Sequence, residues 1–487
     1  MGLWSKKTLA QLQGEADGSE SQGQLKRALS ASNLVFLGIG AIIGAGIFVM
    51  SGQAAARFAG PAVVFSYVLA GLGCGFAGLC YAEFASMIPI AGSAYTYSYA
   101  TLGELLAWII GWDLIIEYLF AASTVAVGWS GYFCDFLRVN LGVTIPESLT
   151  NAPFKADGMQ MVRTGAIVNL PAVLLVVFLT LLLVRGIKES ARFNGFIVLI
   201  KVAIVLLVIG FGLAHVTPDN WKPFIPENTG VTGHFGWSGI ARGAAYVFFA
   251  YIGFDAVSTA AQEAKNPQRD LPIGILGSLG VCTLLYILMS LVLTGVAHFT
   301  TLDVDHPVAK AIEAVPALGW LGWFVKLGAI AGLASVVLVM LLGQPRIFFA
   351  MSRDGLLPPA FGKIHPRFQT PAFATVLTGS IAAILAGLFP LEILGELVNI
   401  GTLLAFVLVC AGVMVLRVRQ PSLPRPFRTP LVPLVPILGI VFCGGLMATL
   451  PWETWVRLLA WLGIGLLIYF GYGRRHSRVG NATRSSA

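Results

Sequence analysis

Twelve apolar stretches of membrane length follow one another in this chain of 487 residues. A helix needs about 20 mostly apolar residues to cross the hydrocarbon core of a bilayer, which is about 30 Å thick. Lipid offers the backbone no hydrogen bonds, so such stretches are expected to be helical. The stretches lie near 34–53, 61–88, 103–138, 165–185, 190–214, 240–262, 272–298, 320–350, 372–389, 393–416, 432–450 and 454–473. We therefore predict an all-α polytopic membrane protein with twelve transmembrane helices.

The composition agrees with a protein that lies mostly in lipid. Charged residues make up 11% of the chain and hydrophobic residues 57%, whereas soluble domains carry about 25% charged residues. Six cysteines fall mostly inside apolar stretches without a CxxC pair, so we interpret them as packing residues and predict no metal site and no cofactor. The chain also lacks HExxH and GxSxG motifs and repeated polar rings, which argues against an intramembrane enzyme and against a channel.

The distribution of basic residues predicts the orientation in the membrane. An even number of helices puts both termini on one side, and most of the 31 Lys and Arg residues fall in segments on that same side. Cytoplasmic segments carry such an excess of Lys and Arg. We predict a plasma-membrane (inner-membrane) location with a cytoplasmic N-terminal tail at 1–33 and a cytoplasmic basic tail at 474–487. The same bias accounts for the net charge of +8 without a nucleic-acid partner.

The first apolar stretch contains an unusual run of glycines, from Gly38 to Phe48. Gly44 and Gly46 lie about ten residues in, or about 15 Å at about 1.5 Å per residue, which is close to the bilayer midplane. A helix that breaks there leaves N–H groups unpaired, which is tolerated where the backbone lines a cavity or binds a ligand. Close helix packing is the alternative, because Gly40 and Gly44 form a GxxxG pair.

The sixth stretch is interrupted in a similar way, by Gly253 and the charged residue Asp255. Interruptions in the first helices of two five-helix blocks are the expected sign of inverted repeats with a binding site between them. We predict a five-plus-five inverted repeat with discontinuous helices 1 and 6. The transport core would span 34–416, with repeats at about 34–214 and 240–416, and 417–473 would form the peripheral helices 11 and 12.

Charged side chains also fall inside other predicted helices, among them Asp113, Glu117, Lys201 and Lys326. Asp113 and Glu117 are four residues apart and therefore share a helix face. Carboxylates at membrane depth usually face a cavity, although bonds to neighbouring helices would also hold them. Lys201 lies about 12 Å into the bilayer, where an ammonium must find a partner or release its proton. It is thus a candidate proton-coupling group or a structural lysine, whereas Lys326 lies near an outer helix end and is expected to reach the interface.

Several motifs together resemble the amino acid–polyamine–organocation superfamily, and within it the bacterial relatives of cationic amino acid transporters. The resemblance runs from about residue 25 to the end of helix 12. The matching motifs are GAIIGAGIF at 40–48, GWDLIIEY at 111–118, FAYIGFD at 249–255, KNPQRDLP at 265–272 and MSRDGLLP at 351–358. The resemblance implies the five-plus-five fold and alternating access.

The resemblance also implies roles for particular residues. The substrate α-carboxylate would bind the unwound amides of helix 1, and the α-amino group would bind carbonyls of helix 6. A lysine on helix 5 would couple transport to protons, and a glutamate on helix 3 would support the substrate. Residues at the matching positions are Ile42, Gly44, Ala45 and Gly46 for the carboxylate, Phe249, Ala250 and Ile252 for the amine, Lys201 for the proton and Glu117 for the glutamate. Leu333 would line an apolar wall, and Glu117 or Asp255 would face a cationic substrate group.

These expectations predict secondary active transport by proton-coupled symport. The substrates would be cationic or small neutral L-amino acids. The protein would also interact with the proton and the lipid bilayer. No residue would be catalytic. Exchange of amino acids at the same site remains an alternative, and so does polyamine transport. The sequence leaves the question of a small accessory membrane protein open.

Overall fold

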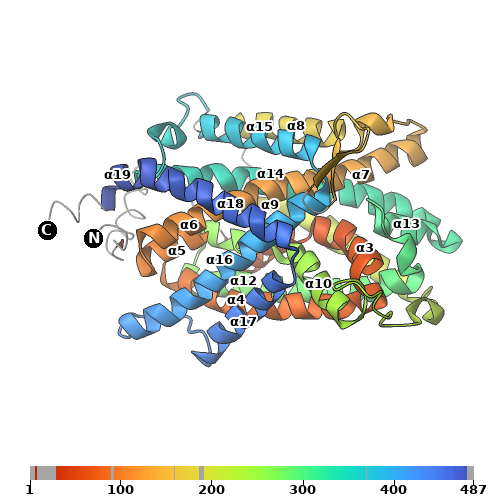
Figure 1. The fold of residues 1–487 in the computed structure, drawn as a ribbon, viewed down its shortest axis with the longest axis horizontal. Coiled ribbons are helices and arrows are strands. Elements are labelled where there is room, and N and C mark those ends of the chain that lie inside the picture. The colour runs from red at the N-terminus through yellow and green to blue at the C-terminus, as the bar shows by residue number, and fades with distance from the viewer. Residues whose placement is uncertain are drawn as a thin grey trace.

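The computed structural model describes residues 6–7, 29–88, 93–157, 160–185, 191–368 and 370–479. Most of the predicted tail at 1–33 and residues 480–487 of the predicted basic tail lie outside these described residues. Long helices dominate the described part, and several of them run along the longest axis of the molecule (Figure 1).

The first half of the chain begins with a helix that is interrupted early. Helix α2 ends at Ile42, and the chain resumes as a π-helix from Gly46 to Met50. The remaining long elements of this half are α3 (Ser51–Ala54), a π-helix Ala55–Ala59, α4 (Val63–Met87), α5 (Ser93–Thr101), α6 (Glu104–Ile115), a π-helix Ile116–Phe120, α7 (Ala121–Leu141), α8 (Leu170–Val184) and α9 (Ala191–Leu213). Short 3₁₀ turns occur at Gly60–Ala62, Glu147–Leu149 and Pro218–Trp221.

The second half also begins with an interrupted helix, formed by α10 (Gly236–Val247), a 3₁₀ turn Phe248–Tyr251 and α11 (Ala256–Thr259). The helices that follow are α12 (Pro267–Val296), α13 (Pro307–Glu313), α14 (Gly319–Arg353), α15 (Ala372–Leu388), α16 (Leu391–Arg419), α17 (Leu434–Ala448), α18 (Trp452–Ile468), a π-helix Tyr469–Gly473 and α19 (Arg474–His476). Short 3₁₀ turns lie at Ala261–Glu263, Phe299–Thr301, Pro316–Leu318 and Pro359–Gly362.

Every predicted transmembrane stretch lies on one of these helices or on an interrupted pair of them. Among the described residues, 8 helical segments are long and apolar enough to cross a membrane. The shorter apolar helices are Ala31–Ile42, Leu170–Val184, Ala372–Leu388 and Leu434–Ala448. The helical, polytopic character is therefore confirmed, whereas twelve crossings and the inverted repeat stay predictions.

Two features differ from the expectations. A two-stranded antiparallel hairpin, β1 (Phe154–Asp157) with β2 (Gln160–Arg163), lies between α7 and α8 and adds a small β element to the predicted all-α fold. The expectation that Lys326 reaches the interface is wrong. Its side chain is fully buried, with Nζ 2.7 Å from a carboxylate oxygen of Asp135 and 2.6 Å from one of Glu313.

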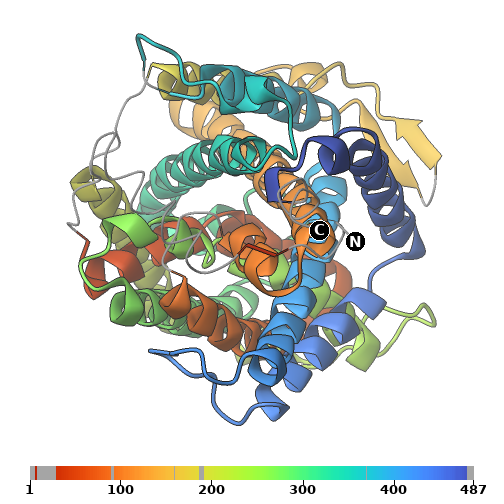
Figure 2. The ribbon, with the colours of Figure 1, turned by 90° about the vertical axis from the view of Figure 1, so that its left-hand side faces the viewer.

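The interrupted first helix lies inside the bundle. Helix α2 packs against α9, α12 and α14, and α10 packs against α4. Figure 2 shows the helices from one end of the molecule, grouped around this centre. The two chain ends meet at that end: Lys7 forms an ion pair with Asp354 at 2.5 Å, and the amide of Arg478 donates to the Asp354 carbonyl at 3.0 Å. Residues 6–7 and 474–479 therefore lie at one end of the bundle.

Candidate functional site

The break in the first helix occurs at Ile43 and Gly44. Ile43 has an extended backbone, with φ −71° and ψ 100°, so the regular helix cannot continue through it. The second half opens with Ala45 and Gly46, and the first amides of a helix have no acceptor within it. Such amides, together with the positive end of the helix dipole, favour an anionic group. The candidate carboxylate residues Ile42, Gly44, Ala45 and Gly46 thus all lie at or beside the break.

The break in the sixth helix occurs from Ile252 to Asp255. Ile252 is extended, with ψ 135°, and Gly253 has φ +114°, a conformation that L side chains rarely adopt. A Cβ atom at Gly253 would also lie 3.0 Å from the carbonyl oxygen of Ala41. Glycine is therefore required here both for the backbone conformation and for the close approach of the first helix.

The two breaks touch each other. A Cβ atom at Gly46 would lie 2.3 Å from Cα of Ala250, so glycine lets the two interrupted helices approach closely. The hydroxyl of Tyr286 on α12 lies 2.9 Å from the Ile42 carbonyl oxygen and 2.7 Å from the Ala250 carbonyl oxygen. Helix breaking and close packing, which the sequence left as alternatives, both occur in this segment.

The carbonyls predicted on the sixth helix also lie at this junction. The carbonyl oxygen of Phe249 accepts from the amide of Ile252 at 3.2 Å. All three predicted residues, Phe249, Ala250 and Ile252, are buried. Their place beside the first break is the geometry that the prediction needs, and their binding role stays a prediction.

Lys201 on α9 reaches the end of the first half-helix. Its Nζ atom donates to the carbonyl oxygens of Gly40 at 2.9 Å and Ile43 at 3.2 Å, and the side chain is fully buried. A Cβ atom at Gly332 would lie 3.1 Å from Cγ of Lys201, so α14 leaves room for the lysine there. These carbonyls end a helix, where the dipole favours a cation. The contacts agree with a proton-coupling lysine and equally with a structural one.

The carboxylates of the third helix lie near the second break. Glu117 belongs to the π-helix Ile116–Phe120 and faces Asp255 and Thr402. Tyr118 donates its hydroxyl proton to Asp255 at 2.8 Å. π-Helical turns often occur at functional sites because they shift a side chain out of the regular helical register. Asp113, one turn earlier, faces Gly401 of α16, where a Cβ atom would be 2.8 Å from its Oδ1 atom.

The apolar wall includes a residue that the sequence did not single out. Leu333 is buried on α14, but the α14 side chain that the structure places against Gly44 is Val336. Sequence reasoning also missed Tyr118, Tyr286 and Asn399, whose side-chain amide donates to the Ala245 and Tyr246 carbonyls at 2.8 and 3.0 Å. Among these, Asn399, which lies with Glu396 and Thr402 in an otherwise apolar stretch, carries the clearest sequence signal.

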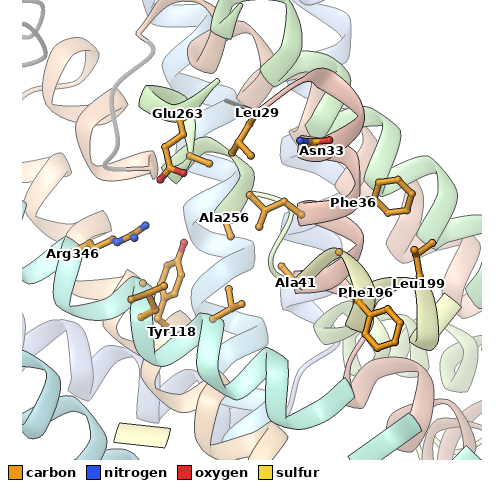
Figure 3. A pocket seen from close by; sticks show the side chains of 16 residues that line it. Leu29, Asn33, Phe36, Ala41, Tyr118, Phe196, Leu199, Ala256, Glu263 and Arg346 are labelled. Atoms are coloured by element: carbon orange, nitrogen blue, oxygen red, sulfur yellow. The ribbon is translucent and has the colours of Figure 1, made fainter. Parts of the chain in front are cut away.

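A cavity of ≈ 580 Å³ lies beside these breaks and extends to Leu29 and Arg346. Ala41 and Ala256, which lie next to the two breaks, line it together with Tyr118 (Figure 3). Leu29, close to the N-terminal tail, lines it as well. Across the described residues, no group of three or more His, Cys, Asp or Glu side chains could hold a metal ion.

Comparison with known proteins agrees with this geometry. The sequence model for the family described as amino acid permease matches residues 29–468. The chain belongs to the amino acid permease family. It is therefore a transporter of the amino acid–polyamine–organocation superfamily and not an enzyme, as the sequence predicted.

Individual relatives of this permease are named for different substrates. The chain is 50% identical to the branched-chain amino acid permease BcaP of Bacillus subtilis (strain 168), over 98% of this chain and 99% of the relative. It is 49% identical to the methylthioribose transporter of the same organism, over 98% of each chain. It is 32% identical to the vacuolar cationic amino acid transporter 4 of Arabidopsis thaliana, over 94% of each chain.

Proposed function

We propose that this permease carries neutral aliphatic L-amino acids across the plasma membrane by proton-coupled symport. The observation that supports this most directly is the junction of the two helix breaks, with the Lys201 ammonium on the carbonyls of Gly40 and Ile43. It combines a place for the two α-groups of an amino acid with a buried basic group beside it. Twelve helices in a five-plus-five inverted repeat would explain why both breaks fall in the first helix of a block.

The substrate would bind with its two α-groups at the two breaks. The amides of Ala45 and Gly46 would hold the carboxylate, and the carbonyls of Phe249, Ala250 and Ile252 would hold the ammonium. Glu117 would add negative charge near the ammonium. Because each α-group contacts a different interrupted helix, binding would link the motions of the two helices.

Three considerations favour an aliphatic side chain over a cationic one. The wall of α14 next to the break is apolar at Val336 and Leu333. Asp255, a candidate partner for a cationic side chain, already accepts a hydrogen bond from Tyr118. The relative with 50% identity is named a branched-chain amino acid permease. This name supports neutral rather than cationic amino acids among the substrates predicted from the sequence.

The proton would act through Lys201. When protonated, its ammonium would hold the end of the first half-helix, and when neutral it would release that helix. Proton entry from outside and exit to the cytoplasm would then drive accumulation. The distribution of Lys and Arg supports cytoplasmic termini, so the cavity next to Ala41 and Ala256 would open to the cytoplasm.

Transport of methylthioribose is a second candidate function, supported by the relative with 49% identity. This sugar has neither an α-carboxylate nor an α-ammonium, so it would not use the two breaks as an amino acid does. Counterflow into proteoliposomes, loaded in turn with leucine, valine, arginine, putrescine or methylthioribose, separates the candidates. We expect leucine and valine to exchange for labelled leucine, and the other three to fail. Exchange of labelled leucine for internal putrescine or methylthioribose, which both lack a carboxylate, would contradict the assignment of the carboxylate site. Failure of leucine to exchange with any of the five compounds would contradict amino acid transport itself.

A further inference from the structure

The cavity that opens beside the helix breaks has one charged wall and one apolar wall. Figure 3 shows Arg346 and Glu263 reaching into it from one side of the view, with the hydroxyl end of Tyr118 nearby. Phe36 and Phe196 lie on the opposite side of the same view. The charged side chains on one side of the cavity and the aromatic rings on the other therefore match an amino acid with an apolar side chain.

The two charges belong to different helical elements and do not neutralise each other. Arg346 is an exposed residue of α14, and Glu263 is a half-buried residue at the end of the 3₁₀ turn Ala261–Glu263. Within the part of the chain that the structure describes, neither side chain has a hydrogen bond or an ion pair. Two opposite charges that line one cavity without forming an ion pair with each other can bind a zwitterionic ligand.

The backbone fixes the position of Glu263. The amide of Leu29 donates to the Glu263 carbonyl oxygen at 3.0 Å, and the amide of Lys265 donates to the Leu29 carbonyl oxygen at 2.8 Å. This short parallel pairing ties the start of α2 to the segment after α11. Backbone hydrogen bonds therefore hold Glu263 next to the start of the first half-helix, where both line the cavity.

We propose that this cavity holds a second amino acid, with its α-carboxylate on Arg346, its α-ammonium on Glu263 and its aliphatic side chain against Phe36 and Phe196. The proposal rests on the proposed function and adds a release-side site to it. A guanidinium binds a carboxylate through two parallel hydrogen bonds, which suits a planar α-carboxylate. Because Ala41 and Ala256 connect the cavity to the breaks, substrate that leaves the central site enters this second site before it reaches water.

Equilibrium binding of labelled leucine to the purified full-length protein tests the number of sites. We expect the wild-type protein to bind leucine at two sites, one of high affinity and one of lower affinity. Arg346→Gln or Glu263→Gln should lower the leucine affinity of the weaker site about tenfold, as expected for loss of a charge-assisted hydrogen bond. The affinity of the tighter site should not change. Arg353→Gln is the matched control, since Arg353 is an exposed arginine of the same helix that does not line the cavity.

Protection of an engineered thiol locates the weaker site. Asn33 lines the cavity and is exposed, so Asn33→Cys in a Cys134→Ser background should react with a membrane-impermeant maleimide. Millimolar leucine should slow this reaction, and the slowing should disappear in Arg346→Gln but persist in Arg353→Gln. Isoamylamine and 4-methylpentanoate, which each lack one α-group, should not protect.

The outcomes separate this proposal from the function on which it rests. A wild-type protein with a single leucine site that Arg346→Gln leaves unchanged would overturn the second site and leave the proposed function intact. Protection by 4-methylpentanoate that equals protection by leucine would also overturn it, because Glu263 would then have no ammonium to bind. A wild-type protein that binds no leucine would contradict both.

Discussion

The Nζ atom of Lys201 lies 2.9 Å from the carbonyl oxygen of Gly40, three residues before the break at Ile43. One buried ammonium thus binds the last carbonyls of a half-helix whose continuation would bind substrate. If the proton leaves, these carbonyls keep only a neutral amine as donor, whose hydrogen bonds are weaker than those of an ammonium. The protonation state of Lys201 is in this way connected to the position of the half-helix α2.

Tyr286→Phe should weaken substrate binding without preventing folding. The lost hydroxyl lies within hydrogen-bond distance of the Ile42 and Ala250 carbonyls, one at each break. Removing a neutral hydrogen bond costs about 1 kcal/mol, or about fivefold in affinity. Leucine binding measured by scintillation proximity checks this. Tyr469→Phe is the control, because this buried tyrosine donates to Glu104 at 2.8 Å, away from both breaks; equal effects of the two variants would argue against a special role for Tyr286.

Glu117→Gln should reduce leucine affinity about tenfold, because a neutral amide no longer attracts the substrate α-ammonium. Expression and detergent elution should stay normal. Asp113→Asn, one turn earlier on the third helix and facing Gly401, should bind leucine as the wild type does. Unchanged affinity in Glu117→Gln would make this glutamate a structural carboxylate that only supports Asp255 and Thr402.

Lys326→Met should lower the thermal unfolding temperature strongly. The ammonium lies between Asp135 and Glu313, and its removal leaves carboxylates without this buried partner. Breaking a buried ion pair by removing one partner typically costs about 3–5 kcal/mol. Thermal unfolding in detergent measures the change. Lys310→Met serves as the control, since Lys310 is an exposed lysine of α13 that should tolerate the change. Similar unfolding temperatures for the two variants would show that the buried ion pair contributes little.

His306 should make the protein less stable in mild acid. Burial lowers the pKa of His306 below its ordinary value, an effect that Lys326 and Arg138 reinforce and Asp135 and Asp305 oppose. The unfolded chain therefore binds a proton more readily than the folded chain, so stability is lost as the pH falls through about 6.5. His306→Gln should reduce the drop in unfolding temperature between pH 7.5 and 5.5. The exposed His298, changed to Gln, should leave the drop unchanged; an undiminished drop in His306→Gln would assign the acid sensitivity to other groups.

The positions of the helices were readable from the sequence because lipid imposes a minimum length and an apolar composition on each of them. The two breaks were also readable, since Gly44 and Gly253 interrupt otherwise apolar helices at membrane depth. Lys201 stood out for a related reason: a charge that deep in the membrane must find a partner, and the structure places it on the carbonyls at the first break.

Contacts between distant helices could not be read from the sequence. Tyr286 lies in an ordinary apolar stretch of α12, and only the folded chain brings its hydroxyl to the carbonyls of Ile42 and Ala250, which lie 244 and 36 residues earlier in the chain. Lys326 was misjudged because helix position alone does not reveal that Asp135 and Glu313 enclose it. The hairpin of β1 and β2 was missed because each strand has only 4 residues, although Phe154 to Asp157 alternates between apolar and polar side chains.

Accumulation of labelled leucine in proteoliposomes tests the central claim, that a proton bound at Lys201 drives amino acid uptake. The inside is held at pH 7 and the outside is stepped from pH 7 to pH 5.5. The wild type should concentrate leucine only when the outside is more acidic. Lys201→Ala should still exchange leucine by counterflow but lose this accumulation, and Lys201→Arg should lose it too, since a guanidinium keeps its proton. Accumulation by Lys201→Ala with the wild-type pH dependence would contradict the account and move the coupling group elsewhere.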